Sequence, residues 1–257
     1  MPTGLSLEQL LPAAVLISLR IGSLMSFAPF FGGAGLPALS KVVLTVVLTA
    51  VLLPVHPSAM IPVTVGGWLQ AAGSELLLGL VMALAMEFVF EAARLAGHIM
   101  GFQLGYSLVN IIDPQTSVDT PVLSVFTYTF GMLIFLQLNV HHWVLRGLAH
   151  SYDVVAPGQA VVTLSSTTML LHGAAGMWNA GMEVAAPVLA ATLLVDILVS
   201  FMAKASPQIP VLQIGMAIKS LIGFGVLWTV ISRWPNLFEH FFALALRFSE
   251  RMLISLR

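Results

Sequence analysis

Long apolar runs, separated by short segments that contain proline, constrain this chain more than any other feature of its sequence. Several of the runs reach the length of about 20 residues that an α-helix needs to cross a bilayer. Most prolines lie between the runs or at their edges, where a missing backbone donor costs least. The sequence therefore predicts an all-α, polytopic membrane protein, with helices near residues 9–28, 37–55, 68–109, 121–149, 168–203 and 211–232.

Composition indicates a chain that meets lipid or a very apolar partner. Hydrophobic residues make up 58% of the sequence, charged residues make up 8%, and the mean hydropathy is +0.99. These values lie far outside the range of ordinary soluble domains. The net charge is -1 and there is no basic tail, so we expect no nucleic-acid partner. The absence of cysteine excludes a disulfide framework, a thiolate metal site and a cysteine nucleophile.

The hydrophobic pattern changes after the last long run. Apolar side chains then recur on one helical face, at Leu237, Phe241, Leu244, Phe248 and Met252. Charged residues lie elsewhere on the same helix, which predicts an amphipathic helix over residues 237–255 rather than another span. No sequence repeat and no low-complexity segment divides the chain, so we expect one domain over residues 1–257.

A glycine-spaced helix leads into a polar segment near the middle of the chain. Ala93, Gly97, Gly101 and Gly105 recur every fourth residue, so they lie on one helical face. That face is nearly bare of side chains, and another backbone can approach it closely. We therefore expect these four residues to form a helix-packing surface.

Charged residues in or near the apolar runs need partners. At the bilayer centre each would cost about 2.5 to 3.5 kcal/mol, against about 0.3 to 0.6 kcal/mol recovered per large aliphatic residue. Several such charges favour burial against protein or water. Arg20 and Lys41 are two of them. The predicted network of buried charges consists of Glu75, Glu87, Glu91, Arg94, Asp196, Lys204 and Lys219.

Two interpretations of these charges stay open: a proton or ion relay, and contacts that hold helices together. Small and acidic residues recur at every fourth position, at Ala71, Glu75, Gly79, Ala83, Glu87 and Glu91. A packing seam uses such a stripe in full, whereas a relay needs only a few of its members. Arg94 follows Glu91 by three residues, which favours a local ion pair. Asp196 and Lys204 lie eight residues apart and Lys219 follows on the next helix, so they can pair among themselves.

Enzymatic and metal chemistry are not expected. His141, His142 and His150 gather around the end of one run, but no HExxH motif occurs and we find no carboxylate at ligand spacing beside them. The sequence also lacks a nucleophile elbow, a phosphate-binding loop and a dinucleotide fingerprint. It predicts no catalytic residue, no cofactor and no metal site.

Three blocks of the chain resemble one known family. The clearest block contains Ala96-Gly97, then Gly101, Gln103 and Gly105, then Asp113-Pro114. It is similar to the AG, GxQxG and DP series of the FliR and SctT family, subunits of the bacterial type III export gate. Other similar positions are Phe135, Asn139, His141, His142, Ala205, Pro207, Gln208, Ile214, Gly215 and Lys219. Val140 and Ala217 depart from the family pattern, which has glycine and proline there.

The resemblance implies a non-enzymatic subunit of the flagellar type III protein export channel. It implies a bacterial inner-membrane location, in the flagellar basal body, within a helical hetero-oligomer that lies partly above the bilayer. The implied partners are FliP-like and FliQ-like subunits, FlhA-like and FlhB-like components, and the unfolded flagellar proteins that are exported. A proton-coupled secondary transporter that uses the intramembrane carboxylates is the alternative function.

The resemblance also implies a pore plug. In the family, the segment after the glycine face projects into the lumen and helps to close the channel. Here that segment covers residues 106–120, and the candidate plug residues are Tyr106, Val109, Asn110, Ile111, Ile112, Asp113 and Pro114. An apolar constriction blocks water and ions by dewetting. A loop that only joins two helices is the alternative for this segment.

Overall fold

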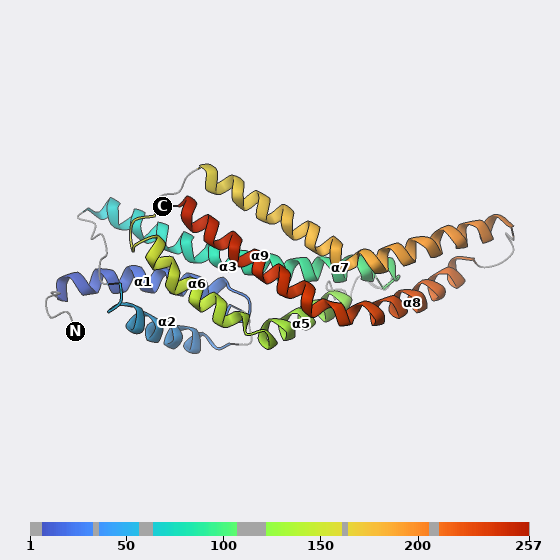
Figure 1. Ribbon diagram of the computed structural model, residues 1–257, viewed down its shortest axis with the longest axis horizontal. Coiled ribbons are helices and arrows are strands. Elements are labelled where there is room, and N and C mark those ends of the chain that lie inside the picture. The colour runs from blue at the N-terminus through green and yellow to red at the C-terminus, as the bar shows by residue number, and fades with distance from the viewer. Residues whose placement is uncertain are drawn as a thin grey trace, which may run out of the picture. The chain divides into compact units, whose positions relative to one another are not determined.

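The computed structural model describes residues 7–32, 36–56, 64–106, 122–160, 164–205 and 211–256, and these residues form helices and turns without a strand. The helices, in chain order, are α1 (Leu7–Phe27), α2 (Ala38–Leu52), α3 (Val65–Gln103), α5 (Val122–Gln137), α6 (Val140–Val154), α7 (Leu164–Ala205), α8 (Val211–Val230), the 3₁₀ turn η1 (Ile231–Arg233) and α9 (Trp234–Ser255) (Figure 1). The predicted all-α fold is confirmed.

Two differences from the predicted helix boundaries have a cause in the backbone. The helix expected over residues 121–149 is divided into α5 and α6, because Asn139 adopts a left-handed backbone with a φ of 55°. Asparagine tolerates that conformation better than most residues. The helix expected over residues 68–109 ends at Gln103, two residues before Gly105, whose φ is 87°.

The chain packs as two compact units. The first unit contains Met1–Phe88, Asn139–Ala174 and Phe242–Arg257, and the second contains Val89–Leu138 and Ala175–Phe241. The helices α3, α7 and α9 each contribute to both units, because each passes from one to the other within its own length. The remaining passage lies between Leu138 and Asn139, at the break between α5 and α6.

In the first unit, α1 packs against α2 and against the first part of α3. The core side chains of α1 are fully buried and include Leu16, Ile17, Ile21 and Leu24. On α6, a Cβ added at Gly147 would lie 3.8 Å from Met82 Cε and 4.0 Å from Leu246 Cδ2, so α3 and α9 both approach α6 there.

The core of the second unit is aromatic. Phe90 packs on Phe135 with ring centroids 5.6 Å apart, and Trp234 packs on Phe130 with ring centroids 5.4 Å apart. Phe238 fills the space left by Gly131, where an added Cβ would lie 3.0 Å from its ring. The first turns of α9 are thereby held against α5.

Among the described residues, four helical stretches are long and apolar enough to cross a membrane: Leu10–Phe27, Val65–Gln103, Thr168–Ala205 and Gln213–Ser255. The pair α5 and α6 passes the same test when taken together. The run expected to span over residues 37–55 forms only the 15 residues of α2, about 22 Å of helix against a hydrocarbon core of about 30 Å.

The predicted C-terminal amphipathic helix corresponds to α9. Its buried face contains Phe238, Phe241, Phe242, Ala245 and Met252, whereas its charged residues Glu239, Arg247, Glu250 and Arg251 are exposed. The predicted apolar stripe shares Phe241 and Met252 with this face. Leu244, also predicted on the stripe, is half exposed, so the buried face is rotated from the expected one.

Candidate functional site: packing faces and paired charges

The backbone of α5 contacts α3 at Ala93 and Gly97, within the second unit. A Cβ on Gly97 would collide with the Leu123 carbonyl oxygen and with the Thr127 hydroxyl. Thr127 donates a hydrogen bond to the Ala93 carbonyl oxygen over 2.7 Å, and Ser124 donates to the Arg94 carbonyl oxygen over 3.0 Å. The side-chain-poor face thus allows hydroxyl groups of one helix to reach backbone carbonyls of the other, as small and hydroxylated residues do between membrane helices.

Gly105, expected on the same face, ends the helix instead. The Tyr106 N–H donates to the Gly101 carbonyl oxygen over 3.0 Å, and the Gly105 N–H donates to the Phe102 carbonyl oxygen over 3.1 Å. This pair of bonds around a glycine of positive φ is a Schellman cap. Tyr106, the first candidate plug residue, is 41% exposed and directly follows the cap.

The remaining candidate plug residues are Val109, Asn110, Ile111, Ile112, Asp113 and Pro114. All six lie outside the described residues. Their role stays a prediction from the family resemblance.

A second close contact lies between α1 and α3 in the first unit, along the predicted stripe of small and acidic residues. A Cβ on Gly79 would collide with the Arg20 carbonyl oxygen. Ser23 donates to the Leu76 carbonyl oxygen over 2.7 Å. Ala71, Glu75, Gly79 and Ala83 are all buried. This part of the stripe has the geometry of a packing seam.

Glu75 forms a fully buried ion pair with Arg20, and both side chains are 0% exposed. Arg20 Nε donates to Glu75 Oε2 over 2.7 Å and Arg20 Nη2 donates to Glu75 Oε1 over 3.0 Å. Such a two-pronged contact is the strong geometry for a guanidinium and a carboxylate. Because α1 carries Arg20 and α3 carries Glu75, the pair joins two helices that are far apart in sequence.

Further hydrogen bonds connect this ion pair to α6 and to the segment after it. Arg20 Nη1 donates to Ser151 Oγ, and Nη2 also donates to the Val155 carbonyl oxygen, each over 3.0 Å. The Gly158 N–H donates to Glu75 Oε1 over 2.8 Å. The ring of Tyr152 lies 4.2 Å from Arg20 Cζ. Partners on every side offset the cost of burying two charges.

Members of the predicted network of seven charges form separate ion pairs in the two units. Its member Glu75 pairs with Arg20, which the sequence singled out without placing it in the network. Arg94 pairs with Glu91, the predicted local ion pair, and these side chains are 39% and 40% exposed. Glu87 is half-buried.

Asp196 of α7 pairs with Lys219 of α8 in the second unit, a pairing that the sequence left open. The Lys219 side chain is 19% exposed and the Asp196 side chain is 42% exposed. Gln103 Nε2 donates to Asp196 Oδ2 over a long 3.5 Å. Lys204, the third candidate, is exposed in the last turn of α7.

The histidines are arranged differently from the expectation. Asp153 follows His150 by three residues, and the sequence pattern did not indicate it as a carboxylate near the histidines. Its Oδ2 lies 3.5 Å from His150 Nδ1, and its Oδ1 lies 3.8 Å from His56 Nδ1. In the described part of the chain, no three histidine or carboxylate side chains are placed to hold a metal ion together.

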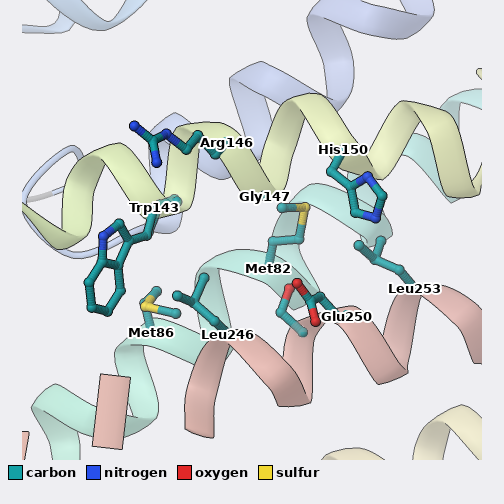
Figure 2. Close-up of a pocket in the computed structure, with 11 residues that line it drawn as sticks. Met82, Met86, Trp143, Arg146, Gly147, His150, Leu246, Glu250 and Leu253 are labelled. Atoms are coloured by element: carbon teal, nitrogen blue, oxygen red, sulfur yellow. The ribbon is translucent and has the colours of Figure 1, made fainter. Parts of the chain in front are cut away.

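A groove of about 330 Å³ lies in the first unit between α3, α6 and α9 (Figure 2). Its lining is largely apolar and includes Met82, Met86, Trp143, Leu246 and Leu253. Figure 2 shows Arg146 on the side of α6 that faces away from α9. The sequence did not reveal this groove because its walls come from three distant segments. Its apolar side chains suit an apolar group, and the polar side chains His150, Ser249 and Glu250 also line it.

Comparison with known proteins identifies the family. The sequence profile of "Bacterial export proteins, family 1" matches residues 11–245. The flagellar biosynthetic protein FliR of Bacillus subtilis is 29% identical over 233 residues, which cover 88% of this chain and 89% of that protein. The proteins of the same name from Escherichia coli and Pectobacterium carotovorum are 25% and 27% identical, and each alignment covers 86% of the relative.

The resemblance that the sequence motifs indicated is thus confirmed along most of the chain. The apolar helices agree with a protein embedded in a membrane. This chain belongs to family 1 of the bacterial export proteins.

Proposed function

We propose that this protein is a structural and gating subunit of the flagellar type III export channel, in the bacterial inner membrane at the flagellar basal body. The observation that carries the proposal is its similarity to proteins named FliR over almost the full length of both chains. The role is structural, and no residue is assigned to catalysis.

Exposed apolar surface supports a subunit role. In the second unit, large apolar side chains of α7 and α8 are exposed, among them Leu194, Leu198, Phe201, Leu221 and Trp228. The half-exposed pair of Asp196 and Lys219 lies between the same two helices. Lipid covers apolar side chains well but solvates charges poorly, whereas neighbouring subunits can cover both.

The proposed neighbours are FliP-like and FliQ-like subunits, with FlhA-like and FlhB-like components at the same assembly. The cargo would be unfolded flagellar proteins. The test is purification of the tagged chain in mild detergent, followed by mass measurement of the intact complex. We expect a hetero-oligomer, and we expect the chain to be unstable when produced alone. A stable monomer with every helix inserted would contradict partner-dependent placement.

The proposed gating element is the segment of residues 106–120. Its support is the family resemblance, together with a defined starting point at the Gly105 cap. Deleting residues 110–117 should raise the ion conductance of the assembled channel, because the apolar constriction is lost. The same complex with an intact loop is the control. Unchanged conductance in a fully assembled complex would exclude the plug.

A proton-coupled carrier has less support. Its candidate carboxylates would be Glu75, Glu87, Glu91 and Asp196. Of these, Glu75, Glu91 and Asp196 are each paired with a cation in the structure. Substrate uptake by the lone protein in vesicles would favour the carrier, whereas activity only in the large complex favours the export channel.

A further inference from the structure

One face of α8 lies against the end of α3, within the second unit. The contacting residues have the helical spacing of a single face, at Met216, Ser220, Gly223 and Phe224. They meet residues 104–106, which directly follow the last residue of α3, Gln103. The chain runs from there into the segment proposed as the plug.

The central contact joins Ser220 and Gly223 of α8 to Leu104. Ser220 Oγ donates a hydrogen bond to the Leu104 carbonyl oxygen over 3.1 Å. Carbonyl groups at a helix end lack partners within the helix, so a hydroxyl from α8 satisfies one of them. Gly223 makes room for this approach, since a Cβ at that position would collide with Leu104 Cδ2.

Two more contacts flank the central one. A Cβ on Gly105 would lie 3.4 Å from Met216 Cε, so the cap glycine also packs on α8. The ring of Tyr106 meets the ring of Phe224 edge-on, with centroids 5.9 Å apart. The first residue of the proposed plug is therefore packed against the same face of α8.

The ion pair anchors this face to α7. Lys219 bonds to Asp196, and Asp196 also accepts the long hydrogen bond from Gln103, the last residue of α3. The last turn of α3 is thus held by side chains from two helices.

We propose that Ser220, Gly223 and Phe224 form a clamp that holds the end of α3 and sets the direction in which the chain leaves it. The gating role of this clamp rests on the proposed function, because the chain that it directs is the proposed plug. In the closed channel the clamp is engaged, and export requires its release. One hydroxyl, one glycine contact and one ring pair are few enough contacts to separate without unfolding either helix.

Cross-linking tests the clamp directly, because the natural chain contains no cysteine. The variant L104C/G223C places two thiols at the clamp, where Leu104 Cγ lies 3.4 Å from the position of a Cβ on Gly223. In cells carrying the complete export apparatus, oxidation should stop export and reduction should restore it.

The matched control is V199C/G215C, which joins α7 to α8 away from α3. Its Cβ separation of 3.7 Å suits a disulfide. The oxidised control should export normally. Normal export through the oxidised clamp variant would overturn the proposal.

A conductance measurement separates failure of the clamp from failure of the plug. The double variant S220A/F224A should raise the conductance of the assembled channel towards that of the deletion of residues 110–117. The control G225A adds a methyl group elsewhere on α8, with no atom within 4 Å of the added Cβ, and should leave the conductance unchanged. If the deletion of residues 110–117 raises the conductance and S220A/F224A does not, the proposed clamp is excluded and the proposed plug is supported. If the deletion does not leak, the plug is wrong and the clamp's gating role falls with it.

Discussion

The two compact units differ in how deeply they bury the ion pair that joins two of their helices. The first unit contains a fully buried ion pair, Arg20 and Glu75, whose hydrogen bonds reach α6 and the segment after it. In the second unit, α5 contacts α3 through a face bare of side chains at Gly97, and its pair Asp196 and Lys219 remains partly exposed. We therefore expect the two ion pairs to contribute differently to stability. Losing one partner of the buried pair is costly, whereas a partly exposed pair contributes little.

The largest expected effect is the loss of one partner from the buried pair. R20A leaves Glu75 charged and enclosed, and breaking a buried pair in this way costs about 3 to 5 kcal/mol. Thermal unfolding of the purified complex, followed by circular dichroism, measures the loss. The control R20M/E75L removes both charges and should be less harmful than R20A. Equal stability of R20A and the natural protein would show that the pair does not hold the first unit.

A smaller effect is expected where helices meet through glycine. G97A places a methyl group against the backbone of α5, and such overpacking costs about 1 to 3 kcal/mol. The control G176A lies on α7 in the same unit and has no atom within 4 Å of the added Cβ. It should gain roughly 0.5 to 1 kcal/mol, because alanine favours helix over glycine. If G97A lowers the unfolding free energy and G176A raises it, the loss in G97A comes from the close contact with α5. If both variants change the unfolding free energy in the same direction, that contact does not explain the effect of G97A.

The smallest effect is expected at the partly exposed pair. D196N should change the unfolding free energy of the chain by no more than about 1 kcal/mol, as for other exposed ion pairs. A double-mutant cycle with K219M measures the coupling between the two side chains. A coupling as large as that of the buried pair would mean that Asp196 and Lys219 also fix the fold, and the contrast between the units would disappear.

The local features of this fold were predictable from particular residues. The glycine spacing at Ala93 and Gly97 indicated a surface for close packing, and α5 lies on it. The spacing of Glu91 and Arg94 indicated their ion pair. Both follow from helical periodicity, which relates neighbours within one helix and needs no knowledge of the rest of the chain.

Other features were not predictable because they depend on contacts between distant segments. Gly105 belongs to the glycine series by spacing, yet its positive φ makes it the cap of α3. Asn139 lies within one apolar run but divides it into two helices by the same backbone conformation. Hydropathy predicts neither outcome, because a run of apolar residues does not indicate where the backbone adopts a positive φ.

By itself, the sequence determined that this protein is helical, apolar and a member of an export family, since periodicity, composition and motif order are all local properties of the chain. Only the tertiary structure decided that Glu75 bonds to Arg20, 55 residues away, and that α8 holds the end of α3. The physical reason is that a buried charge takes whichever partner the packing of helices brings within about 3 Å. That choice depends on where whole helices cross, which no single stretch of sequence records.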